Sequence, residues 1–140
     1  MRSRWQATLS KRASPLEALV FRSRLIGDEE RLGLFGGGNT STKCQQPDLF
    51  GQPQDVLWVK GSGANLKGCE ARHFAPLRLD ALRRLVARRS MTDEEMIAFL
   101  ERCLLDPKAP RPSVETLLHA FLPERDIDHT HADAILALAD

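Results

Sequence analysis

The sequence DVLWVKGSG, residues 55–63, gives the clearest indication of how this chain folds. Four apolar residues stand in a row at 56–59, and glycine follows almost at once. A run this short predicts a buried β-strand, because helices usually need about ten to twelve residues of periodic pattern. The glycine-rich residues 60–65 then predict a loop at the end of that strand.

A second apolar run, residues 32–35, leads into a second glycine-rich stretch, GGGNTSTK, at 36–43. We predict another strand followed by a loop, and then a polar hairpin over 44–54. Glycine lets backbone N–H groups turn toward an anion, and Asn39 and Ser62 add neutral donors. Neither loop matches a Walker A or GxGxxG pattern. Each loop alone is typical of a tight turn, whereas the pair favours a site for a small phosphorylated molecule.

Capping residues and apolar stripes predict four helices, over residues 14–27, 79–86, 92–104 and 113–121. Ser14 with Glu17, and Thr92 with Glu95, form capping boxes at the first and third of these helices. Ser113 is expected to cap the fourth, with Leu117, Leu118 and Phe121 on its buried side. A third strand over 127–131 and a helix over 132–140 complete a chain of the α/β or α+β class. Three strands do not close a sizeable sheet, so we expect the N-terminal part of a longer protein.

The amino-acid composition argues against several classes of function. The 140 residues hold 20 Lys and Arg against 19 Asp and Glu, a net charge of +1, which argues against nucleic acid as a partner. No run approaches the ~18 apolar residues of a membrane helix. Three cysteines without CxxC spacing favour the reducing cytoplasm. The basic residues 1–12 are more typical of a solvated start than of a transit peptide.

Three side chains near the C-terminus indicate chemistry. His129 and His131 are two residues apart, so on a strand they point to the same side, ~7 Å apart, and can bind one metal ion. Glu115 lies 14 residues before His129 and near a predicted helix start, where it can serve as a base beside an anion site. Taken singly, each has an ordinary structural role, because histidines often pack and glutamates favour helix N-termini.

In order along the chain, four motifs resemble those of the class II aldolase/adducin family: GGGNTSTK at 36–43, VLWVKGSG at 56–63, RPSVETLLHAFLP at 111–123 and DHTHADAI at 128–135. The residues of these motifs are most similar to the aldolase part of bifunctional rhamnulose-1-phosphate aldolase/short-chain dehydrogenase proteins. The resemblance implies an α/β fold, a three-layer αβα class II aldolase/adducin-like domain that is incomplete at the C-terminus. Residues 1–20 would be a basic lead-in with the start of the first helix, and residues 21–140 the N-terminal part of the domain.

The resemblance also implies site residues. The substrate phosphate would be bound by Gly38, Asn39, Ser62, Gly63 and Ser113. Glu115 would be the acid/base residue, and His129 and His131 with Glu115 would bind zinc or another divalent metal. The metal acts in the family as a Lewis acid toward an enediolate, and cleavage of rhamnulose 1-phosphate gives dihydroxyacetone phosphate and lactaldehyde. NAD is implied only if a dehydrogenase domain follows, and family members are typically cytoplasmic homotetramers that bind neither nucleic acid nor membranes.

Two departures from the family pattern shape the expectations. Family members supply a third histidine well after the HxH pair, but this chain ends nine residues after His131, and it contains no tyrosine. We therefore expect these residues alone to bind metal weakly and to turn over little. An adducin-like interaction module without catalysis is the alternative, although the HxH pair with Glu115 argues against it. A small metallohydrolase is a third possibility, but it would leave the phosphate loops unused.

Overall fold

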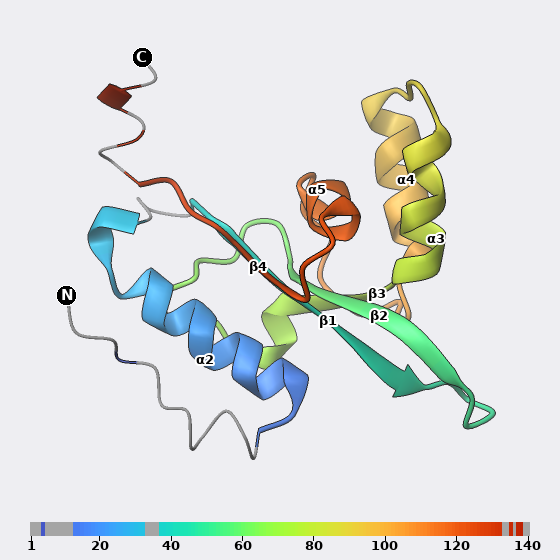
Figure 1. Ribbon diagram of the computed structural model, residues 1–140, viewed down its shortest axis with the longest axis horizontal. Helices are drawn as coiled ribbons and strands as arrows, with labels where there is room; N and C mark the ends of the chain where they lie inside the picture. The colour runs from blue at the N-terminus through green and yellow to red at the C-terminus, as the bar shows by residue number, and fades with distance from the viewer. Residues whose placement is uncertain (1–3, 5–12, 33–36, 133–134, 136, 139–140) are drawn as a thin grey trace.

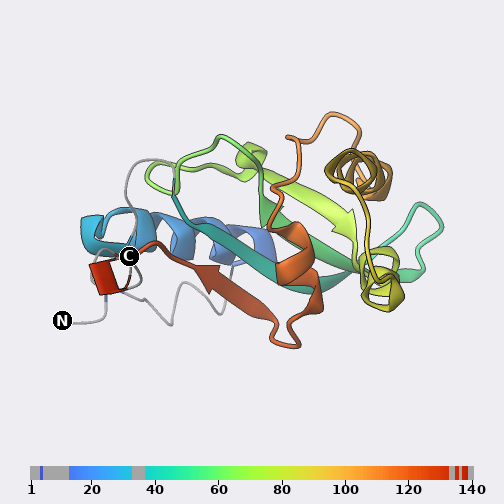
Figure 2. The ribbon, with the colours of Figure 1, turned by 90° about the horizontal axis from the view of Figure 1, so that it is seen from above.

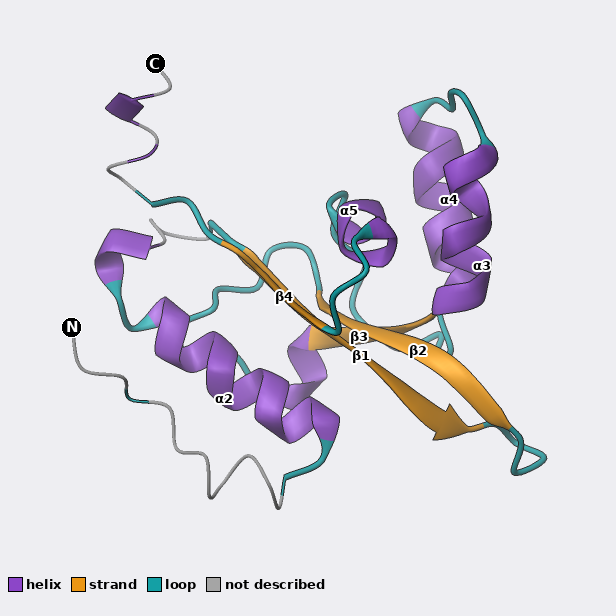
Figure 3. Cartoon of the chain, viewed as in Figure 1, coloured by secondary structure: helices purple, strands orange, loops and turns teal. Residues whose placement is uncertain are grey.

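The computed structural model describes residue 4 and residues 13–32, 37–132, 135 and 137–138. Its centre is an antiparallel sheet in the order β3-β2-β1-β4 (Figure 3). The strands are β1 (Asn39–Pro47), β2 (Pro53–Lys60), β3 (Phe74–Arg78) and β4 (Asp126–His129). The helices are α2 (Pro15–Gly27), α3 (Leu79–Arg84), α4 (Asp93–Cys103) and α5 (Thr116–Phe121), with single 3-10 turns at η1 (Glu30–Leu32), η2 (Ala71–His73) and η3 (Leu85–Ala87).

The helices form a layer on each face of the sheet. Helix α2 covers one face, while α3, α4 and α5 lie on the other (Figures 1 and 2). Side chains alternate along β2 accordingly, so that Leu57 and Val59 pack toward the second group while Trp58 packs toward Leu19 of α2. This arrangement confirms the predicted three-layer αβα fold.

Two helices begin where the capping boxes predict. Ser14 Oγ accepts from the Glu17 N–H at 3.3 Å, and the Glu17 carboxylate accepts from the Ser14 N–H at 2.7 Å. Thr92 and Glu95 form the same reciprocal pair at the start of α4, at 3.2 and 3.0 Å. These bonds satisfy backbone donors that the first helical turn leaves unpaired, so the start of each helix is fixed locally.

The strand predictions need three corrections. Residues 39–43, predicted as a loop, form the first half of β1, which pairs with β2 so that Ser41 lies opposite Val59. The predicted excursion over 44–54 is the hairpin that joins these two strands. Strand β3 was not predicted at all, and Leu32, predicted to start a strand, ends η1. Residues 33–36 of that predicted strand lie outside the described residues.

The search for apolar runs does not predict β1, because the buried residues of this strand are polar. Its first four residues, Asn39 to Thr42, are at most 2% exposed. The Thr40 hydroxyl is 2.7 Å from Ser23 Oγ, the Ser41 hydroxyl is 2.8 Å from His119 Nδ1, and the Thr42 hydroxyl donates to Asp126 at 2.7 Å. A buried hydroxyl is tolerated when it is hydrogen-bonded, so each of these residues can occupy the interior of the fold.

Helix α5 also differs from its prediction. Its buried residues are Thr116, His119 and Ala120, whereas Leu118 and Phe121 are 51% and 40% exposed. Leu117 packs against the core as expected. The helix begins at Thr116, and Ser113 does not cap it but accepts from the Glu115 N–H at 3.3 Å in the preceding turn. The polar residues face inward because each has a partner there, with Thr116 donating to the Ser113 carbonyl.

Three remaining predictions concern the ends of the chain and the thiols. The basic residues 1–12, apart from Arg4, and most of the predicted helix 132–140 lie outside the described residues. No helix in the described part of the chain has the length and apolar character needed to cross a membrane. The cysteines, Cys44, Cys69 and Cys103, are all free thiols.

Candidate functional site

Three strands from distant parts of the sequence begin or end at the same edge of the sheet. This is the edge formed by the strand ends, not the side formed by an outer strand. Strand β1 begins at Asn39, β2 ends at Lys60 and β4 ends at His129. Asn39 lies opposite His129, and Ser41 lies opposite Val59. The two glycine-containing segments and the HxH pair, separate in sequence, therefore share this edge.

Glu115, His129 and His131 form a cluster at this edge. Their potential ligand atoms all lie within 4.8 Å of one another, and all three residues are partly buried. The two imidazole centroids are 4.9 Å apart, nearer than the ~7 Å between alternate residues of a strand, so the two rings tilt toward each other. Glu115 reaches the same point from the turn before α5, with Oε1 2.9 Å from His129 Nδ1.

The positions of Glu115 and His129 fit two ligands of one metal ion better than a hydrogen-bonded donor and acceptor. His129 Nδ1 is buried and, among the described residues, makes no hydrogen bond, although Glu115 Oε1 lies 2.9 Å away. The two atoms are close but are not aligned as donor and acceptor. Neighbouring ligands of a tetrahedral zinc ion, at bonds of ~2.0 Å, lie ~3.3 Å apart. Two imidazoles and a carboxylate thus fit a zinc-like divalent cation.

The predicted phosphate residues lie on three segments around this cluster. Gly38 has φ +83°, and a Cβ there would be 2.9 Å from the His129 carbonyl, so only glycine fits beside β4. Asn39 is buried, and its Oδ1 has no hydrogen-bond partner within the described residues. Its position opposite His129 places this amide beside the cluster.

The other two phosphate segments are joined to each other. The Ser62 N–H donates to the Arg111 carbonyl at 2.9 Å, and Gly61 forms a bridge with Pro112. Ser62 and Gly63 are exposed at the tip of the loop, next to the segment that carries Ser113. The structure therefore brings the second loop and Ser113 together, and the turn after Ser113 leads to Glu115.

Sequence reasoning missed two buried residues of this region, Lys60 and His119. His119 is fully buried, with Nδ1 bonded to Ser41 Oγ and with Nε2 unpaired within the described part of the chain. Burial lowers the pKa of His119 to about 4, with the Glu115 charge opposing the shift. The spacing of four between Glu115 and His119 is a signal that predicts neighbouring side chains at a helix start.

Comparison with known proteins identifies the family. Residues 17–140 match the family model of the class II aldolase and adducin N-terminal domain. The chain belongs to the class II aldolase and adducin family. A solved structure, the N-terminal class II aldolase domain of a conserved protein from Thermoplasma acidophilum, is 43% identical with a TM-score of 0.91. It is matched by all of this chain, which covers 64% of the solved chain.

A curated relative is much longer than this aldolase-family chain. The uncharacterized oxidoreductase YuxG of Bacillus subtilis (strain 168) is 50% identical over 133 residues. That match takes in 92% of this chain but only 19% of the relative. Class II aldolases use a divalent metal, and the cluster of Glu115, His129 and His131 offers ligands for one.

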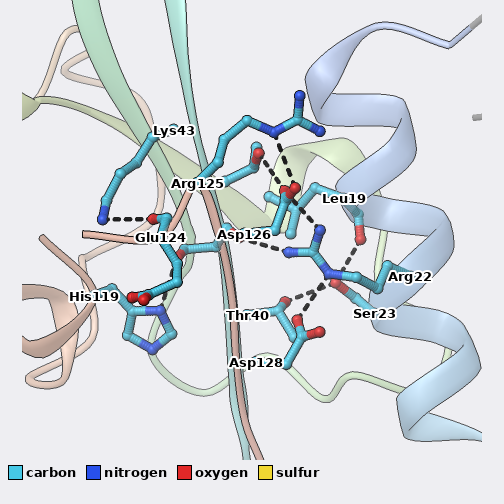
Figure 4. Close-up of polar contacts among 12 residues, drawn as sticks. Leu19, Arg22, Ser23, Thr40, Lys43, His119, Glu124, Arg125, Asp126 and Asp128 are labelled. Atoms are coloured by element: carbon cyan, nitrogen blue, oxygen red, sulfur yellow. Dashed lines mark hydrogen bonds and ion pairs between the residues drawn. The ribbon is translucent and has the colours of Figure 1, made fainter. Parts of the chain in front are cut away.

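An arginine from α2 fixes the strand that carries His129 (Figure 4). The Arg22 guanidinium donates to Asp126 and Asp128 at 2.8 Å each and to the Ser41 carbonyl at 2.6 Å. Burial tends to raise the pKa of Asp126, but bonds from Thr42 and Arg22 outweigh it and lower that pKa. Arg22 thus ties the edge strand β4 to β1 and α2.

We expect Arg22→Met to destabilise this aldolase domain by ~2 kcal/mol, since it removes the charge partner of Asp128 and leaves Asp126 only Thr42 and the exposed Arg125. The aspartate side chains are 35% and 34% exposed, which keeps the cost below that of a fully buried pair. Urea denaturation measures the free energy of unfolding. Arg125→Met is the matched control, because Arg125 also pairs with Asp126 but is 76% exposed, and it should cost less than ~0.5 kcal/mol. Equal losses in both variants would contradict the role of Arg22.

Proposed function

We propose that this domain belongs to a metal-dependent aldolase that cleaves a ketose 1-phosphate of the rhamnulose 1-phosphate type. The products would be dihydroxyacetone phosphate and lactaldehyde. The observation that carries the proposal is the convergence of Glu115, His129 and His131 at one sheet edge, beside loops suited to bind a phosphate ester. Family membership supports a carbon–carbon lyase.

The phosphate would be bound by neutral groups on the three segments. Gly38 and Gly63 offer backbone N–H groups at positive φ, while Asn39, Ser62 and Ser113 offer side-chain donors. These neutral donors would bind the phosphate oxyanion through hydrogen bonds. Anchoring the phosphate in this way positions the carbon chain of the sugar against the cluster.

Glu115 would move the proton at the carbon that becomes nucleophilic. Zinc or another divalent ion bound by His129, His131 and Glu115 would supply Lewis-acid stabilisation of negative charge on the substrate oxygens. A carboxylate has two oxygens, so one can face the cation while the other accepts a proton. The position of Glu115 in a turn beside His129 suits this double use.

The wider setting of the domain is proposed from its relatives. The oxidoreductase named among them supports a protein in which an aldolase domain is joined to a dehydrogenase, and NAD would bind there rather than to this chain. We assign residues 21–140 to the N-terminal part of the aldolase domain. The full-length protein would be a cytoplasmic homotetramer.

Product analysis on the full-length protein tests the proposal. The purified protein, loaded with zinc, is given a panel of ketose 1-phosphates and their unphosphorylated counterparts. We expect dihydroxyacetone phosphate and an aldehyde from a phosphorylated ketose, with slow or no cleavage of the matching free sugar. Release of inorganic phosphate would instead indicate a hydrolase. Metal binding without any cleavage would favour the adducin-like module.

A further inference from the structure

Lys60 is a buried cation whose role the proposed reaction leaves open. It ends β2 and is only 4% exposed. Its ammonium donates to the Ala64 carbonyl at 2.6 Å and to the Gly61 carbonyl at 3.3 Å. Both acceptors belong to the loop 61–64 that follows it, so the lysine is enclosed by its own loop.

These two bonds determine which way the loop presents its polar groups. In a trans peptide the C=O and the following N–H point in opposite directions. Because the Gly61 and Ala64 carbonyls turn inward to Lys60, the N–H groups of Ser62 and Asn65 turn away from it. The Ser62 N–H meets the Arg111 carbonyl, whereas those of Gly63 and Asn65 have no protein acceptor within the described residues.

The electrostatics of the loop favour an anion on its outer side. Burial lowers the pKa of Lys60, while the Glu115 carboxylate opposes that shift and favours the charged form. A cation this deeply placed needs strong hydrogen-bond acceptors, and the two carbonyls supply them. The ammonium offsets the partial negative charge of these two carbonyls. The N–H groups that point away from Lys60 then lie at the exposed end of the loop, where an anion can reach them.

We propose that Lys60 is a positioning residue for phosphate recognition, which holds the Gly61 and Ala64 carbonyls inward and so turns the free Asn65 N–H, next to that of Gly63, toward the phosphate ester of the substrate. This inference rests on the proposed function, because it takes loop 61–64 as the phosphate-binding segment. Lys60 lies beneath the loop and does not need to touch the substrate.

Calorimetric measurement of inorganic phosphate binding tests the inference directly. We expect Lys60→Met to weaken phosphate binding by ~10-fold or more, because the loop loses two charge-assisted bonds. Lys67→Met is the matched control, since Lys67 is exposed a few residues further along the chain and carries the same charge. It should change the dissociation constant by less than ~2-fold, as expected for a screened surface charge.

Cobalt binding at Glu115, His129 and His131 reports whether each variant is folded, and Lys60→Gln replaces Lys60→Met if the latter is not. In the unmodified protein, phosphate should also shift the amide resonances of Gly63 and Asn65, a measurement that depends on no variant. Absence of phosphate binding to the unmodified protein would overturn the proposed function. Binding that leaves these two amides unmoved, or that survives in folded Lys60 variants, would overturn the role of Lys60 alone.

Discussion

Replacing His129 by alanine is expected to weaken metal binding strongly and, in the full-length protein, to abolish aldol cleavage. His129 supplies the central nitrogen of the cluster, since its ring lies 4.9 Å from that of His131 and its Nδ1 lies 2.9 Å from Glu115. Loss of one of three protein ligands leaves too few donors for a tetrahedral cation. We expect zinc affinity to fall by ~100-fold or more.

Competition with a chromophoric chelator measures the zinc affinity, and the absorption of bound cobalt reports the ligand geometry. His73→Ala is the control, because the Nδ1 of His73 accepts from the Glu70 N–H and the residue lies outside the cluster. It should retain both metal binding and cleavage. Unchanged cleavage in His129→Ala would remove the metal mechanism, whereas lost binding in a protein without cleavage would point to the adducin-like alternative.

Features set by local sequence were predictable. The capping boxes at Ser14 and Thr92 determine where α2 and α4 begin, because the bonds that stop the chain from fraying come from residues three apart. The alternation of β2 places Leu57 and Val59 on one face for the same local reason. The HxH pair lies on one side, as the predicted strand 127–131 implied, although β4 ends at His129 and His131 follows it on extended chain.

Features that depend on distant partners were not predictable. The polar start of β1 lies inside the fold because Thr40 meets Ser23 of α2 and Ser41 meets His119 of α5. A hydrophobicity pattern contains no sign of those partners, so it predicts a loop for β1 and the wrong buried side for α5. The placement of Glu115 beside His129 follows from the same packing, and the motif resemblance anticipated it where periodicity did not.

Acidification is expected to destabilise the metal-free domain through His119. This residue is fully buried, and burial lowers its pKa to about 4 from an ordinary value of 6.5. Well above pH 6.5 the ring is neutral in both the folded and the unfolded chain, so it contributes no pH dependence. Below that pH the unfolded chain takes up a proton that the folded chain excludes, and the free energy of unfolding falls.

The loss should accumulate between pH 6.5 and about pH 4 and reach ~3 kcal/mol at the lower end of that window. Between pH 7 and pH 5 we expect ~2 kcal/mol, measured by urea denaturation in the presence of a chelator. The matched variant is His119→Asn, whose amide can keep the bond to Ser41 Oγ but does not titrate. Subtracting its pH dependence from that of the parent isolates the histidine from the carboxylates that titrate nearby.

The same burial bears on the metal site. A protonated His119 would add a positive charge close to Glu115 and His129, whose charges already influence its pKa. Keeping the ring neutral down to about pH 4 leaves the cluster free of a competing cation throughout the neutral range. If the parent and His119→Asn lost stability equally between pH 7 and pH 5, His119 would have to be charged, or its ring reached by water, in the folded chain.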